Sequence, residues 1–187
     1  MTAAAKLPTP TEVVAFWRDA GPSLWFKGGA AFDARCRDVL GEAHMAAARR
    51  ELEHWPQDAQ DAQGALALVL LLDQIPRNIF RDSAHAFATD GLARLHADAA
   101  IAAGFDLQVD PSLRLFFYMP FEHSELLVDQ ERSVALFEAL GDPDFLGYAR
   151  RHLEPIARFG RFPHRNPMLG RHTTADEQAY LDAGGGF

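Results

Sequence analysis

The feature that most constrains the fold is an apolar run that passes directly into a polar segment. Residues 65–72 read ALALVLLL, and residues 73–81 continue as DQIPRNIFR with no loop signal between them. The apolar run is typical of a buried helix, so the charged and amide groups that follow it start from a core position. Such groups are costly to bury unless they are paired or hydrogen-bonded. They must therefore meet a partner within the chain, meet a ligand, or turn outward.

The polar segment continues the helical phase of the apolar run across a proline. Apolar residues keep one face in phase at positions 68, 71, 72, 75 and 79, and a polar stripe follows positions 74, 77, 78 and 81. We therefore expect a kinked helix, or two helical pieces nearly in line. Because Pro76 has no N–H, the carbonyl of Leu72 should seek another donor. The alternative is that Asp73 and Arg77 only pair at i, i+4 and the proline turns the chain.

Helical periodicity covers almost the whole chain, and strand alternation is nearly absent, so we predict an all-α fold of about eight helices. Capping boxes at Thr9 and Thr174 predict the starts of the first and last helices, which end before Gly21 and Gly184. Further helices are predicted over residues 32–55, from 58 into the opening segment, and over 90–104, 112–118, 124–140 and 143–159. Residues 25–29 are predicted to be a loop, and Pro120 to interrupt a helix.

The length of the chain suits one compact domain over residues 1–187. Cys36 is the only cysteine, so no internal disulfide can form and an oxidising compartment is not indicated. The N-terminus lacks the apolar segment of a secretory signal, and no run approaches the length that spans a bilayer. We therefore expect a cytoplasmic protein that does not bind membranes.

The charge is unevenly distributed along the chain. The formal net charge is -8, which argues against a nucleic-acid binder, yet residues 150–171 carry six arginines and one acid. A basic segment on an acidic body most simply docks onto that body. The more specific interpretation is that this basic segment forms a binding site for an anion.

A second polar cluster interrupts an apolar helix around Pro120. Glu122, Glu125 and Asp129 have offsets of 0, 3 and 7, so a continuous helix would place three carboxylates on one face. Carboxylates that lie close together are stable only near arginines, a metal or solvent. His123 would point away from Glu122 on such a helix, and no second histidine stands at ligand spacing, so we expect neither a metal nor another cofactor.

The third cluster, residues 158–167, is dense in hydrogen-bond donors and broken by glycine and proline. Arginine suits carboxylate and phosphate groups, and the ordinary pKa of a histidine such as His164 is close to neutrality. In the alternative interpretation, Phe159 and Phe162 anchor the segment while Arg158 and Arg161 neutralise acids of the core. The acids in question are Asp73, Glu122 and Asp129.

Several long blocks of the chain resemble the signature blocks of a bacterial protein family of unknown function. The blocks cover residues 14–17, 25–26, 70–81, 119–125, 129–133 and 158–166, and the resemblance extends over nearly the whole length. It implies a tetratricopeptide-like fold, in which antiparallel helix pairs stack in an array. It implies no activity, substrate or residue role.

Two function classes fit these observations. The first is a site for a small polar or anionic molecule, with or without a reaction, built from the three clusters. Its ligand-binding residues would be Arg77, Asn78, Arg158, Arg161 and Arg165, and its proton-transfer groups Asp73, Glu122 and His164. The second class is a module that binds a peptide or a protein partner in a helical groove. We favour the first, because the unusual residues are compact functional groups flanked by core.

Overall fold

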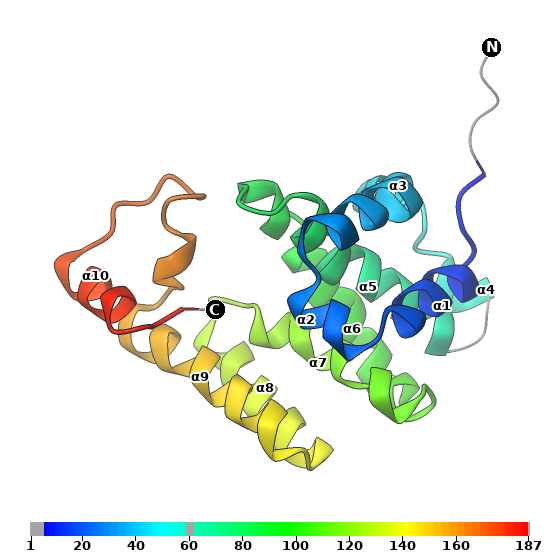
Figure 1. The fold of residues 1–187 in the computed structure, drawn as a ribbon. Helices are drawn as coiled ribbons and strands as arrows, with labels where there is room; N and C mark the ends of the chain where they lie inside the picture. Colours follow the sequence, from blue (N-terminus) through cyan, green and yellow to red (C-terminus); the bar gives the residue numbers. More distant parts are fainter. Residues whose placement is uncertain (1–5, 59–61, 187) are drawn as a thin grey trace. The chain divides into compact units, whose positions relative to one another are not determined.

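The computed structural model describes residues 6–58 and 62–186 (Figure 1). Within these ranges the chain is all-α and forms no strand, as predicted. The helices are α1 (Pro10–Ala20), α2 (Pro22–Lys27), α3 (Gly29–Ala48), α4 (Trp55–Asp58), α5 (Ala62–Ile79), α6 (Asp90–Ala102), α7 (Leu115–Glu122), α8 (Leu127–Leu140), α9 (Pro143–Phe159) and α10 (Ala175–Asp182). None of them is both long enough and apolar enough to cross a membrane.

The described residues form two compact units, and the boundary between them falls within α7. The first unit contains residues 6–81 and 85–117, and the second contains residues 82–84 and 118–186. Two units that pack separately can still fold together as one domain. The single domain over residues 1–187 therefore stays a prediction.

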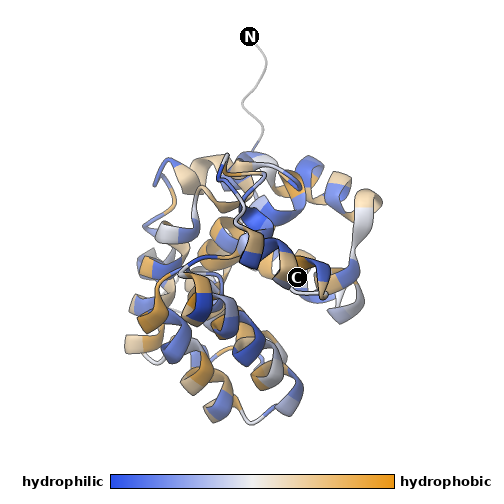
Figure 2. Cartoon of the chain, turned by 90° about the vertical axis from the view of Figure 1, so that its left-hand side faces the viewer, coloured by the Kyte–Doolittle hydropathy of each residue, from blue (hydrophilic) through white to orange (hydrophobic). Residues whose placement is uncertain are grey.

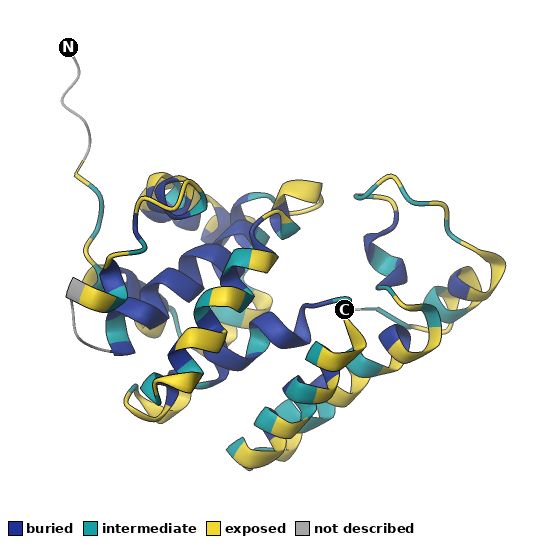
Figure 3. Ribbon diagram, turned by 180° about the vertical axis from the view of Figure 1, so that it is seen from behind, coloured by how far each residue is buried: buried dark blue, intermediate teal, exposed yellow. Residues whose placement is uncertain are grey.

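Helix α5 is the centre of the first unit. It is buried along almost its whole length (Figure 3), and α1, α3, α4 and α6 pack around it. A helix that is apolar on all sides is stable only in such a position. Trp17 of α1 lies against Phe32 of α3, and its main-chain oxygen accepts a 2.6 Å hydrogen bond from the Trp25 indole.

The predicted passage through Pro76 is confirmed, because α5 continues as one helix to Ile79. Pro76 has no N–H that could donate to the carbonyl of Leu72. This carbonyl instead accepts a hydrogen bond from the hydroxyl of Thr89 at 2.5 Å. The neighbouring carbonyl of Leu71 lies 2.7 Å from Nδ1 of His44. Both carbonyls thus reach side chains of other segments of the first unit.

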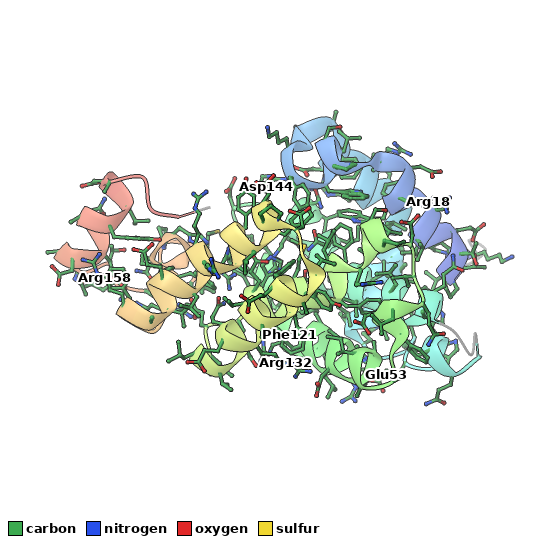
Figure 4. The ribbon with its side chains drawn as sticks, turned by 90° about the horizontal axis from the view of Figure 1, so that it is seen from below. Arg18, Glu53, Phe121, Arg132, Asp144 and Arg158 are labelled. Carbon is green, nitrogen blue, oxygen red and sulfur yellow. The ribbon has the colours of Figure 1, made fainter. Side chains whose placement is uncertain are left out.

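The second unit is built on the hairpin of α8 and α9. The two helices pack together, and the turn between them consists of Gly141, in the left-handed region at φ +81°, and the N-cap residue Asp142. Hydrophobic and polar residues alternate along the helices (Figure 2), and Phe137 of α8 and Ile156 of α9 are buried. The guanidinium of Arg132, labelled in Figure 4, lies 4.3 Å from the centre of the Phe121 ring.

Several predicted helix ends are wrong. Residues 22–27, predicted in part as loop, form α2, and α3 ends at Ala48 because Arg50 takes a left-handed conformation at φ +65°. Helix α7 continues through Pro120 to Glu122, since its aromatic residues are buried and outweigh one missing hydrogen bond. Helix α8 begins at Leu127, three residues later than predicted. The third helix is predicted to start near residue 58, but α4 ends there, and α5 begins at Ala62 after residues 59–61, which lie outside the described ranges.

Candidate functional site

The first polar cluster joins α5 to the start of α6. Arg77 lies 3.3 Å from the carboxylate of Asp73, and it donates two hydrogen bonds to Asp90 at 2.8 and 3.0 Å. The Asp73 side chain is fully buried and also accepts from Gln74 at 2.6 Å. The i, i+4 pair that the sequence predicts is therefore present, but Arg77 binds a second acid as well. Asn78 donates to the main-chain oxygen of Gln74 at 3.1 Å.

The electrostatics of this cluster favour the charged form of Arg77. Burial acts to lower the pKa of Arg77, but the charges of Asp73 and Asp90 outweigh it and raise that pKa. Arg77 thus makes its polar contacts with groups of its own unit, and so does Asn78. Their role toward a ligand stays a prediction.

Glu122 and Glu125 of the second cluster have separate partners. Oε1 of Glu122 lies 2.7 Å from Nδ1 of His152, and that nitrogen is also 2.9 Å from the main-chain oxygen of Tyr148. The sequence does not predict the role of His152, because the pair joins α7 to α9 and the spacing of residues within one helix does not indicate such a contact. Glu125 accepts from Arg171 at 2.8 and 2.7 Å and from the backbone N–H of Phe162 at 2.9 Å.

The three carboxylates do not share a helix face, so that expectation is wrong. Helix α7 ends at Glu122 and α8 starts at Leu127, and Asp129 accepts a 2.6 Å hydrogen bond from Ser124. Burial acts to raise the pKa of Glu125, but the hydrogen bonds from Arg171 and Phe162 lower it below its usual range. Each of the three acids therefore has a polar partner of its own.

The third cluster closes around Glu177, at the start of α10. This carboxylate is buried and accepts from Nε and Nη2 of Arg161 at 2.6 and 2.9 Å. It also accepts from the Thr174 backbone at 2.8 Å, which completes the predicted capping box. The hydrogen bond from Arg161, reinforced by Thr174, lowers the pKa of Glu177 to about 2. The alternative in which Arg161 neutralises Asp73, Glu122 or Asp129 is therefore wrong, because the ion-pair partner of Arg161 is Glu177.

The middle of this cluster is aromatic. The buried Arg165 side chain lies over the ring of Phe162 at 4.4 Å, and the His164 ring is 5.6 Å from the same phenyl. Burial, helped by the charge of Arg165, lowers the pKa of His164 to about 4. His164 is thus neutral at pH 7, well away from the near-neutral pKa that was expected of it.

A hollow of about 400 Å³ lies between α9, α10 and the chain that follows α10. We call it the α9–α10 hollow, and it is lined by Arg151, Glu154, Arg158, Ala179, Tyr180 and residues 183–186. Figure 4 labels Arg158 toward the C-terminal end of α9. Its guanidinium lies 4.6 Å from the centre of the Phe159 ring, and no carboxylate of the described residues is within ion-pair distance of it.

The walls of the α9–α10 hollow are polar and tightly fitted. Burial and the charge of Glu154 raise the pKa of Tyr180, against the opposing effects of the Gly186 backbone, Arg151 and Arg158. A Cβ atom added at Gly185 would lie 2.4 Å from the Tyr180 ring, so only glycine fits at this approach. The glycines after α10 therefore place the backbone directly against one wall of the hollow.

The described residues contain no group of three histidine, cysteine or acidic side chains arranged to hold a metal ion. Cys36 is buried, and burial together with the charge of Asp33 raises the pKa of its thiol to about 12. A thiol with so high a pKa is a poor nucleophile.

Comparison with known proteins identifies relatives but no activity. A protein of unknown function from Agrobacterium tumefaciens, ATU0120, has a solved structure that is similar to this one with a TM-score of 0.88. The two sequences are 48% identical, over 93% of this chain and 97% of that chain. No functionally curated protein matches the chain. The model of the DUF924 family, described as a bacterial protein of unknown function, matches residues 13–185. The chain therefore belongs to the DUF924 family of bacterial proteins.

Proposed function

We propose that the second unit binds a small anionic molecule in the α9–α10 hollow, with Arg158 as the principal cation. One observation supports this proposal above all. Arg158 lines the hollow without an ion-pair partner among the described residues, whereas Arg161 and Arg171 each bind a carboxylate through two nitrogens. A guanidinium in this situation can offer its planar pair of donors to a carboxylate or a phosphate.

The wider residue set predicted from the sequence belongs to the same proposal. Arg77, Asn78, Arg161 and Arg165 would have to exchange contacts within their own units for contacts with a ligand, so Arg158 is the better candidate. Asp73, Glu122 and His164 stay candidates for proton transfer. Binding itself requires none of them.

The test is a thermal-shift titration at low ionic strength with inorganic phosphate and with citrate, because a ligand that binds the native state raises its melting temperature. Arg158→Gln should weaken the response about tenfold, the loss expected for a hydrogen bond to a charged group. Arg150→Gln is the matched control, since Arg150 is exposed on the same helix, loses the same charge and does not line the hollow. An equal response of the two variants would contradict the proposal.

A protein-interaction module is the second candidate. It is favoured by three consecutive exposed apolar side chains at the start of α8, where Leu126, Leu127 and Val128 are 55%, 46% and 67% exposed. The tetratricopeptide-like pairing of helices and the cytoplasmic location belong to this proposal as well. Leu127→Ser would reduce self-association or partner capture in size-exclusion chromatography if this surface is an interface, and would leave anion binding unchanged.

A further inference from the structure

We propose a second ligand site, in the first unit, that takes a small zwitterion with an apolar side chain, such as a free aliphatic amino acid. The site is a hollow of about 280 Å³ between α1, the first turn of α5 and the segment of residues 108–113. We call it the α1–α5 hollow. It shares no residue with the α9–α10 hollow, so the two proposals stand or fall separately.

The floor of the α1–α5 hollow is part of the apolar core. Val14, Leu66 and Leu113 line it, and these side chains are only 5%, 0% and 2% exposed. Since these side chains expose almost no surface, a ligand on this floor gains mainly by removing its own apolar surface from water. This favours a ligand with an aliphatic group over a fully polar one.

Two opposite charges stand at the rim of the hollow. Arg18, labelled on α1 in Figure 4, has a side chain that is 52% exposed, and its Nε lies 3.3 Å from Asp19. Asp110 accepts from the backbone and hydroxyl of Ser112 through Oδ1 alone, at 2.9 and 2.7 Å. Its Oδ2 has no hydrogen-bond partner among the described residues.

The charges at the rim influence each other without closing into an ion pair. The hydrogen bonds from Ser112, and then the charge of Arg18, lower the pKa of Asp110, so the carboxylate is ionised at neutral pH. No ion pair joins Arg18 to Asp110 within 4.0 Å. A ligand with a carboxylate for the arginine and an ammonium for the aspartate matches this arrangement.

Two amides complete the rim. The side chain of Gln63 makes no hydrogen bond to a described residue, and Gln108 uses only Nε2, which donates to the main-chain oxygen of Gly104 at 3.1 Å. An apolar floor with a few converging polar groups is the usual form of a small-molecule site. Arg18, Gln108 and Asp110 are exposed to solvent, so a ligand at the rim would replace water at these polar groups.

The experiment is a titration of the full chain with L-leucine, followed by the methyl NMR signals of Val14, Leu66 and Leu113. We expect a saturable shift of these signals. The analogues 4-methylpentanoate and 3-methylbutylamine, which lack the ammonium and the carboxylate respectively, should each bind about tenfold more weakly. If leucine at millimolar concentration produces no saturable shift, the proposal is overturned.

Two variants test the rim directly. Arg18→Gln and Asp110→Asn should each weaken leucine binding about tenfold, and asparagine preserves the helix cap that Asp110 forms. Arg49→Gln, at an exposed arginine outside the hollow, is the charge control and should bind leucine like the parent protein. Binding that is equally strong in Arg18→Gln and Asp110→Asn as in the control would also overturn the proposal.

Discussion

The hydroxyl of Thr89 donates to the main-chain oxygen of Leu72 across 2.5 Å, at the carbonyl that Pro76 leaves without a helical donor. This relationship explains how a proline is accommodated inside the buried helix α5. It also explains why Thr89, which precedes α6, makes no capping hydrogen bond with its side chain. The hydroxyl donates to the Leu72 carbonyl of α5 instead.

Replacing Thr89 by valine should destabilise the protein. The shape of the side chain is nearly kept, but the buried Leu72 carbonyl loses its donor, and a buried polar group without a partner costs about 1–3 kcal/mol. Urea unfolding of Thr89→Val would measure this loss. Thr11→Val is the control, since Thr11 is exposed on α1 and its change should be small.

A second substitution identifies the cause of that loss. Pro76→Ala supplies an N–H that can donate to Leu72, so Thr89→Val should cost less in the Pro76→Ala background than alone. Additive losses of unfolding free energy in the double variant would mean that the Leu72 carbonyl is not the shared partner.

Features that depend on neighbours in the chain could be predicted from the sequence. The capping boxes at Thr9 and Thr174 and the continuity of α5 across Pro76 follow from residues within one or two turns of each other. The end of α3 could not be predicted. The helical pattern continues past Ala48, and only the left-handed backbone of Arg50 ends the helix.

The sequence shows the residue types of the three polar clusters, but it does not show their partners. His152 meets Glu122 from another helix, and Arg171 meets Glu125 across 46 positions. Ion pairs of this kind depend on tertiary packing, which spacing within one helix does not encode. Glu177 was recognised as a capping residue, yet its second role, as the acid for Arg161, depends on how α10 folds back.

Arg77→Met should be among the most destabilising substitutions in the first unit. It keeps most of the apolar stem but removes the cation that lies 3.3 Å from the fully buried Asp73 carboxylate and 2.8 Å from the Asp90 carboxylate. Removing one partner of a buried ion pair costs about 3–5 kcal/mol. Urea unfolding should show this loss, whereas Arg49→Met, at an exposed pair with Glu51, should change stability by less than about 1 kcal/mol.

Arg161 and Arg158 should respond differently to the same substitution. Arg161→Met leaves the buried Glu177 carboxylate without its main donor and should cost about 1–3 kcal/mol. Arg158→Met removes no ion pair of the described residues and should change stability by no more than about 0.5 kcal/mol. Thermal and urea unfolding of the two variants would measure the difference, and equal losses would contradict the structural role of the Arg161–Glu177 pair.

The Glu177 network should make the second unit sensitive to acid. The pKa of Glu177 falls from its ordinary value near 4.5 to about 2 in the folded chain, so its contribution to stability is complete above pH 4.5. It is lost as the pH falls toward 2, because the unfolded chain takes up the proton first. Glu177→Gln should therefore flatten the dependence of unfolding free energy on pH in this window. Glu12→Gln, in the other capping box but without an arginine partner, should flatten it less.

His164 should stay neutral throughout the physiological range. Its pKa is lowered from 6.5 to about 4 by burial and by the charge of Arg165. Below pH 6.5 the folded chain thus binds fewer protons than the unfolded chain. The free energy of unfolding therefore decreases as the pH falls from 6.5 toward 4, whereas His164 does not reduce it above pH 6.5. The imidazole Cε1–H signal of His164 should move only slightly between about pH 8 and pH 5 in the native protein, but should titrate normally in concentrated urea. A native midpoint near 6.5 would show that the ring is solvated, and would restore His164 as a near-neutral proton carrier.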